Sequence, residues 1–161
     1  MGAGSDAGLM FMRRAIDLSR IKMEAGEGGP FGAVIVHGGV IIGEGWNRVL
    51  GTHDPTAHAE IVAIRDACAR LGTFRLVGAE IYTSCEPCPM CLAAILWARL
   101  DRMYFANTRL DAAAIGFDDA LFYDEVVRPL EKRSLPAERL LADEARAVFA
   151  EWDRKPDKVQ Y

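Results

Sequence analysis

The sequence His58-Ala59-Glu60, followed further along the chain by Pro87-Cys88-Pro89-Met90-Cys91, sets both the fold and the chemistry of this protein. Zn²⁺ prefers imidazole nitrogen and thiolate sulfur, and His58, Cys88 and Cys91 supply one of the first and two of the second. Three protein ligands leave the fourth tetrahedral position free for a water molecule, as in catalytic zinc sites. Glu60 is not needed as a ligand and is placed to carry protons to and from that water.

The residues around this motif indicate where its parts lie. An apolar-periodic run after His58 predicts a helix over about 57–71 that ends at Gly72, and residues 80–84 are typical of a strand. The prolines around Cys88 predict a second helix over about 89–99. Each helix would hold its ligands in the first turn, so two helix N-termini would point at one place. Their partial positive charge favours thiolate over thiol.

Other uses of the cysteines and histidines were weighed. Cys85 could complete a closed, four-ligand structural zinc site, but Glu60 would then have no role and Cys85 stands at a strand end. Disulfides are less favoured, because no signal peptide is recognisable and three cysteines crowd within seven positions. Cys68, on the apolar helix face, is expected in the core. We interpret His37 as a hairpin-edge residue and His53 as a loop residue.

The order of elements predicts the fold class. A hairpin followed by alternating helices and strands indicates a three-layer α/β/α fold with a mixed central sheet. Besides the elements above, we expect helices over 6–25, 118–126 and 136–152 and strands over 33–36, 40–42 and 102–106.

Length and charge bound the remaining possibilities. The chain has 161 residues, enough for one domain with a real core. We expect residues 1–8 to be disordered, 9–155 to form the zinc-dependent domain and 156–161 to be a tail. No apolar run approaches the roughly 20 residues of a membrane span, so we expect a cytoplasmic protein. The formal net charge of −4 argues against nucleic acid as a partner.

Several segments together resemble a known family. H-x-E followed by P-C-x-x-C is the signature of zinc-dependent nucleobase deaminases. The glycine-rich start of a strand, an asparagine and an acidic segment accompany it in order, at Gly29–Ala33, Trp46-Asn47 and Gly116-Phe117-Asp118-Asp119. With a terminal tyrosine, they make the chain resemble the bacterial guanine deaminases of the cytidine deaminase superfamily, from about Met10 onward. The zinc motif alone is shared with cytidine, cytosine and tRNA adenosine deaminases.

The resemblance implies a reaction and a set of contacts. The C2 amino group of guanine would be hydrolysed to give xanthine and ammonia, with Zn²⁺ as cofactor. Glu60 would carry protons, and Asp119 would read the guanine edge and act as a second proton carrier. The substrate would also be bound by the ring of Phe31, the side chain of Asn47, the backbone at Ala59 and the indole of Trp97. Each of these side chains also has a structural alternative. Phe31 could be strand core and Trp97 helix core, Asn47 could make only a turn, and Asp119 could be only an N-cap.

The resemblance also implies a homodimer. Tyr161 would reach the neighbouring subunit's site as part of a swapped C-terminal segment, although Gln160 stands where the family would have an acidic residue. Guanosine, an aminotriazine such as ammeline and adenosine in tRNA are alternative substrates. A non-catalytic binding module stabilised by zinc is the alternative of another class.

Overall fold

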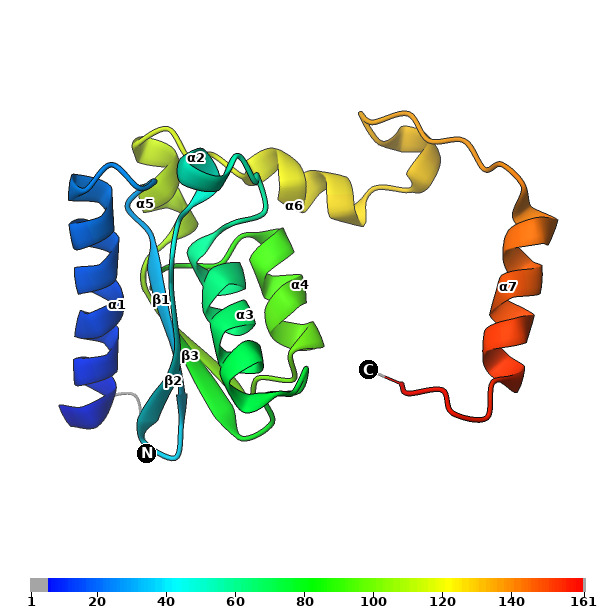
Figure 1. Cartoon of the computed structure of the whole chain (residues 1–161). Coiled ribbons are helices and arrows are strands. Elements are labelled where there is room, and N and C mark those ends of the chain that lie inside the picture. The colour runs from blue at the N-terminus through cyan, green and yellow to red at the C-terminus, as the bar shows by residue number, and fades with distance from the viewer. Residues whose placement is uncertain (1–5, 161) are drawn as a thin grey trace. The chain divides into compact units, whose positions relative to one another are not determined.

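The computed structural model describes residues 6–160, which divide into two compact units, residues 6–120 and residues 121–160. The first unit contains the sheet and the helices that cover it (Figure 1). Its elements are α1 (Asp6–Glu24), β1 (Gly32–His37), β2 (Val40–Trp46), α2 (Val49–Thr52), α3 (Ala59–Leu71), β3 (Ala79–Cys85), α4 (Pro89–Trp97), β4 (Arg102–Asn107) and α5 (Arg109–Ala114). From the unit boundary onward the chain forms α6 (Ala120–Val127), the 3-10 helix η1 (Leu130–Lys132) and α7 (Ala142–Arg154).

The central sheet confirms the mixed topology expected from the sequence. Its strand order is β2-β1-β3-β4. β1 pairs antiparallel with β2 and with β3, whereas β3 and β4 are parallel. The β1–β2 hairpin turns at Gly38-Gly39, where both residues have positive φ angles that glycine adopts without strain. The parallel pair requires a crossover, and α4 provides it.

Helices cover both faces of the sheet, which gives the three expected layers (Figure 1). α1 packs on one face and α3 and α4 on the other. One apolar cluster lies beneath α1 and the other beneath α3 and α4. β1 supplies both clusters: Val34 and Val36 face α1, whereas Ala33 and Ile35 belong to the cluster on the opposite face. Cys68 is packed against that second cluster, as expected.

α3 lies unusually close to β2, and glycine allows this approach. A Cβ atom at Gly45 would lie 2.1 Å from the backbone oxygen of Ala59, and one at Gly43 would lie 2.6 Å from that of Ala63. Both distances are shorter than any real Cβ contact. Small residues on both elements therefore fix the position of α3 on the sheet, and the start of α3 carries the first part of the motif.

The structure differs from the expected organisation in four respects. Residues 6–8, expected in a disordered N-terminus, are the first residues of α1. The helix expected over 136–152 begins at Ala142, because Leu141 has a left-handed backbone with φ of 50°. The short helices α2 and α5 were not predicted. The single domain expected over 9–155 is divided after Ala120.

The second unit lacks a core of its own. None of the residues of η1 and α7, or of α6, is buried. Large apolar side chains of α7 are exposed, among them Val148, Phe149 and Trp152. Among the described helices, none is long and apolar enough to cross a membrane.

Candidate metal centre

Three side chains from two helix starts converge on one point. His58 is the N-cap of α3, Cys88 is the N-cap of α4, and Cys91 lies in the first turn of α4. Their ligand atoms all lie within 4.8 Å of one another. His58 Nδ1 is 3.6 Å from Cys88 Sγ and 3.5 Å from Cys91 Sγ. Tetrahedral zinc with ordinary Zn–N and Zn–S bonds separates such ligand atoms by about 3.5 Å, so these residues fit a zinc ion.

Local backbone structure brings the ligands to the helix starts. His58 and Cys88 are both extended, with ψ angles of 157° and 168°, and the helical conformation begins at the next residue. Proline at the first position of α4 suits a helix start, because proline has the required φ and no N–H to lose. The positive ends of two helix dipoles therefore meet at the ligand group, which favours anionic sulfur.

The two thiols are electrostatically distinct. The thiolate of Cys88 accepts a hydrogen bond from the Cys91 thiol and lies beside His58, which lowers the pKa of Cys88 to about 4. The same hydrogen bond, together with burial and the nearby Glu60, raises the pKa of Cys91. The hydrogen bond between His58 and Cys88 raises the pKa of His58.

Glu60 lies beside the ligand group in a nearly dry environment. Its side chain is 6% exposed, and burial raises the pKa of its carboxyl. Oε2 lies 3.3 Å from Sγ of Cys91, and Oε1 lies 3.4 Å from the hydroxyl of Thr83. A carboxyl group with a raised pKa beside a three-ligand site has the properties of a general acid and base.

Cys85 is not part of the ligand group. Its thiol donates to the backbone oxygen of Thr108 at 3.6 Å, and burial raises its pKa to about 11. Within the part of the chain that the structure describes, the group of metal-ligand candidates consists of His58, Cys88 and Cys91. The closed four-ligand site considered from the sequence is therefore not the arrangement that this geometry provides.

The residues expected to bind substrate have varied surroundings. Phe31 is half-buried, and its ring meets that of Phe117 edge to face at 4.9 Å. Asn47 is buried, and its Oδ1 accepts hydrogen bonds from the amides of Gly29 and Val49. Ala59 is fully buried as the first residue of α3. Their contacts with substrate stay predictions.

The two acidic residues Asp118 and Asp119 have different surroundings. The carboxylate of Asp118 accepts a hydrogen bond at 3.0 Å from the amide of Ala120, the first residue of α6. Asp119 is half-buried, and its pKa is raised by burial and by the negative charge of Cys88. The influence of Cys88 indicates that Asp119 lies near the ligand group.

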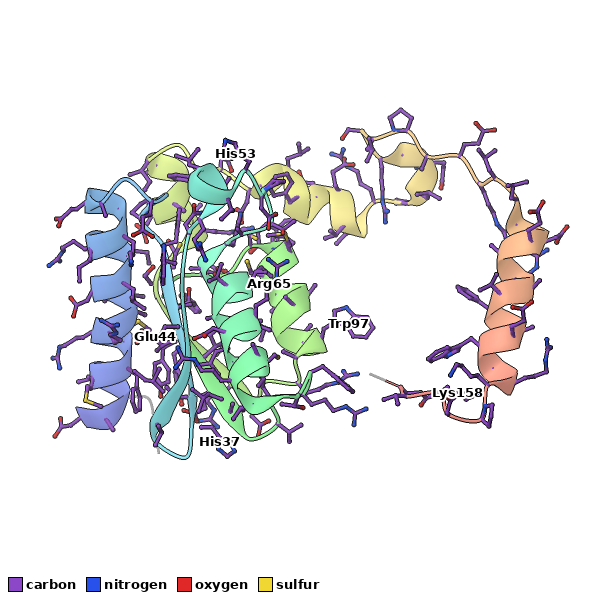
Figure 2. All side chains as sticks on the ribbon, viewed as in Figure 1. His37, Glu44, His53, Arg65, Trp97 and Lys158 are labelled. Atoms are coloured by element: carbon purple, nitrogen blue, oxygen red, sulfur yellow. The ribbon has the colours of Figure 1, made fainter. Side chains whose placement is uncertain are left out.

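One expected site residue, Trp97, lies away from the ligand group in the described chain. Trp97 is 60% exposed and lies six residues beyond Cys91, which is about 9 Å along the helix axis and about 120° around it. Figure 2 shows its side chain projecting from the last turn of α4. On the described chain Trp97 therefore lies away from these ligands, and its contact with substrate stays a prediction. Tyr161 lies outside the described residues.

Neither remaining histidine joins the site. Figure 2 shows His37 at the end of the β1–β2 hairpin and His53 beside α2, toward opposite ends of the sheet. His53 ends α2 in a left-handed conformation with φ of 53°. Both positions agree with the edge and loop roles predicted for them.

The sequence reasoning missed two residues near the site, Thr83 and Phe117. Thr83 contacts Glu60, and Phe117 contacts Phe31. A signal existed for Thr83, because strand alternation places it on the same face as Ile81 and next to the cysteine motif. Phe117 could be recognised only as part of the motif at 116–119, since its partner Phe31 is distant in the sequence.

Comparison with known proteins places this geometry in context. Residues 7–107 match the family described as "Cytidine and deoxycytidylate deaminase zinc-binding region". The guanine deaminase of Bacillus subtilis (strain 168) is 48% identical over 151 residues, which cover 94% of this chain and 97% of that protein. An X-ray structure of guanine deaminase from Bacillus subtilis superposes with a TM-score of 0.92 at 47% identity, over 94% of this chain and 97% of that one.

More distant relatives act on other substrates. A tRNA-specific adenosine deaminase of Haemophilus influenzae is 43% identical over 114 residues, which cover 67% of this chain and 65% of that protein. The similarity to the Bacillus protein therefore covers a larger share of this chain than the second match does.

Proposed function

Because the chain belongs to the cytidine and deoxycytidylate deaminase family, we propose that it is a zinc-dependent hydrolase that converts guanine to xanthine and ammonia. The observation that carries this proposal is the similarity to a guanine deaminase over 94% of the chain, together with a buried carboxylate next to three ligand side chains. The reaction adds water at C2 of the purine and releases the amino group as ammonia.

Glu60 performs the proton transfers. A bound zinc ion supplies a Lewis acid that makes water nucleophilic near neutral pH. Glu60 takes a proton from the attacking water and delivers protons to the ring nitrogen and to the departing amine. Burial raises the pKa of Glu60 toward neutrality, which suits a group that must both accept and donate. His58, Cys88 and Cys91 hold the metal and do not exchange protons with the substrate.

The remaining contacts orient the base. Phe31 packs on the purine ring, Asn47 and the backbone at Ala59 bind its polar atoms, and Asp119 reads the guanine edge. Asp119 also acts as a second proton carrier, which its raised pKa supports. Phe31 and Asn47 lie at the two ends of one backbone hydrogen bond, from Asn47 N to Phe31 O at 3.0 Å. A displacement of either residue would therefore disturb both contacts.

The protein acts as a homodimer with a swapped C-terminal segment. Two observations support this part of the proposal. Residues 121–160 contain helices without a single buried residue, and α7 exposes Val148, Phe149 and Trp152. Apolar surface of this kind is stable in water when a partner covers it. Tyr161 would then close the neighbouring site.

The dimer and the tail have separate tests. Light scattering should give twice the chain mass of 17.7 kDa. Deleting residues 156–161 should reduce activity on guanine far more than zinc content. Equal loss of activity and zinc would mean that the deletion unfolds the protein, and a monomeric mass would contradict the swapped dimer.

The test of the activity is ammonia release by the zinc-loaded protein from a panel of amino-bearing heterocycles. The panel contains guanine, guanosine, ammeline and a tRNA with adenosine in its anticodon. Guanine should be the preferred substrate. Preferred deamination of the tRNA would support the second candidate, which the similarity to tRNA-specific adenosine deaminases motivates. The formal charge of −4 disfavours that candidate.

The Glu60→Gln variant tests the proton carrier. It should keep its zinc and lose roughly 10²–10⁴-fold in kcat, the usual contribution of general acid–base catalysis. Glu80→Gln is the matched control, because Glu80 lies at the other end of β3 and bonds to Tyr82. Near-wild-type turnover by the Glu60→Gln protein would remove Glu60 from the mechanism.

A further inference from the structure

Thr83 is a hydroxyl residue in the buried part of β3. Only 1% of its surface is exposed, and it pairs with Ala33 of β1 and with Phe105 of β4. Ile81, on the same face of the strand, belongs to the apolar cluster beneath α3 and α4. A hydroxyl in such a place is costly unless it is hydrogen-bonded, and valine would fill nearly the same shape. The partners of this hydroxyl therefore indicate what it does.

The hydroxyl of Thr83 lies between the strand and Glu60, and its single hydrogen is shared by an acceptor on each. Its Oγ1 lies 3.0 Å from the backbone oxygen of Cys85 and 3.4 Å from Oε1 of Glu60. The other carboxylate oxygen, Oε2, lies 3.3 Å from Sγ of Cys91. The two oxygens of Glu60 thus have different neighbours, with Oε1 directed at β3 and Oε2 at the ligand group.

We propose that Thr83 is a positioning residue that fixes the rotation of the Glu60 carboxylate, so that Oε2 faces the metal ligands. The side chain of Glu60 reaches this point through three rotatable bonds from α3, and burial alone does not choose between its two oxygens. The contact of the Thr83 hydroxyl with Oε1 determines that Oε2 is the oxygen that faces the ligands. The catalytic consequence rests on the proposed function, whereas the orientation itself does not.

The same hydroxyl links two elements, β3 and α3. Thr83 contacts the backbone oxygen of Cys85, the last residue of β3, which lies three residues before Cys88, the N-cap of α4. Glu60 belongs to α3. Thr83 therefore sets the carboxylate of one helix relative to the strand that leads into the cysteine helix.

Kinetics of two Thr83 variants provide the first test. Thr83→Val removes the hydroxyl and nearly preserves the shape, and it should lower kcat for ammonia release about 10- to 100-fold, the range for a lost hydrogen bond to a charged group. KM and zinc content should change less than about threefold, because no ligand or substrate contact is removed. Thr83→Ser should restore most of kcat. Unchanged kcat in the valine variant, or no recovery with serine, would overturn the catalytic part.

Ser84→Ala is the matched control. Ser84 is also buried in β3, but its hydroxyl accepts the amide of Gly32 at 3.0 Å. This variant should lose stability without losing kcat. An equal loss of kcat in both variants would mean that any buried hydroxyl of β3 matters, which contradicts the proposal.

Crystal structures of the zinc-loaded wild type and the Thr83→Val variant provide a second test that needs no activity. The carboxylate of Glu60 should rotate in the variant, while His58, Cys88 and Cys91 stay in place. A Glu60 side chain that superposes in both structures would refute the positioning role. Should the wild type release no ammonia from any compound of the panel, the proposed function fails and this comparison alone decides the role of Thr83.

Discussion

Cys85 and Cys88 are separated by two residues, yet they have opposite surroundings. Cys85 ends β3 and points its thiol at the backbone of Thr108, whereas Cys88 begins α4 and faces His58. Burial raises the pKa of the first thiol to about 11, and hydrogen bonding lowers that of the second to about 4. A change of backbone direction between the strand and the helix thus separates a core thiol from a metal ligand.

This difference predicts the zinc content of two serine variants. Cys91→Ser should lose nearly all bound zinc, because a hydroxyl is a far poorer ligand than a thiolate. Cys85→Ser should keep the zinc content of the wild type. Elemental analysis of the purified, folded proteins makes the measurement. Loss of zinc from the Cys85→Ser protein would indicate that Cys85 is a fourth ligand, as in the closed structural site.

The local part of the site could be predicted from sequence, and the rest could not. His58, Cys88 and Cys91 lie in short motifs at helix starts, where spacing and capping fix their directions. The role of Trp97 could not be derived locally, because helix geometry turns it away from residues six positions earlier. Thr83 was missed because its partner belongs to α3, and only strand pairing brings the two together.

At the scale of elements, the contact of α3 with β2 determines where His58 lies. Gly45→Ala would place a methyl group against the backbone of Ala59, the residue that follows His58. The variant should be destabilised by about 1–3 kcal/mol or more, and its zinc affinity should fall because the start of α3 is displaced. Urea unfolding and zinc competition measure the two effects.

Gly51→Ala is the control for this prediction. A Cβ atom there would meet its nearest neighbour, the oxygen of Glu27, at 3.4 Å, which is an ordinary contact. Because Gly51 lies in α2, alanine should leave stability unchanged or raise it slightly. Equal effects of the two substitutions would mean that close packing of α3 is not what positions the site.

α1 and β2 are joined by a two-pronged ion pair that predicts a pH dependence of stability. Arg14 donates from Nε and Nη2 to the two oxygens of Glu44 at 2.7 and 2.8 Å, which lowers the pKa of Glu44 below 4.5. A lowered folded-state pKa contributes stability above the unfolded value, and this contribution is lost as the pH falls through the folded value. Because the pair is partly exposed, its contribution should be below about 1 kcal/mol.

Glu44→Gln tests this pair. Relative to the wild type, the variant should be less stable at pH 7, and the difference should shrink as the pH falls below 4.5. Urea unfolding at several pH values measures it, and Glu24→Gln at the exposed end of α1 is the control. A difference that is constant with pH would show that Glu44 acts through packing and not through its charge.

Elements with strong periodicity or clear end signals were predicted well, and the others were not. Long runs such as α1 and α3 carry enough turns to reveal an apolar face. α5 is too short for that, although a capping box formed by Thr108 and Asp111 marks its start. The late start of α7 follows from the backbone of Leu141, and its acidic residues Asp143 and Glu144 mark the true first turn.

At the scale of the whole molecule, both apolar clusters lie within residues 6–120. This part of the chain therefore has stability that does not depend on a metal. Chelation of zinc should abolish ammonia release but leave a folded protein with a cooperative, lower thermal transition. Far-UV circular dichroism with and without a chelator makes the measurement. Complete unfolding on chelation would favour the non-catalytic, zinc-stabilised module.

His58 precedes its two sulfur partners by 30 and 33 positions, with β3 between them. A ribosome therefore releases the imidazole and most of the sheet well before the second thiolate. Until Cys91 emerges, the nascent chain offers an incomplete set of metal ligands, which binds zinc weakly. Metal capture is consequently a late event in biosynthesis, and translation under zinc starvation would yield chains with a finished scaffold but an inactive centre, ready for rescue by later addition of the ion.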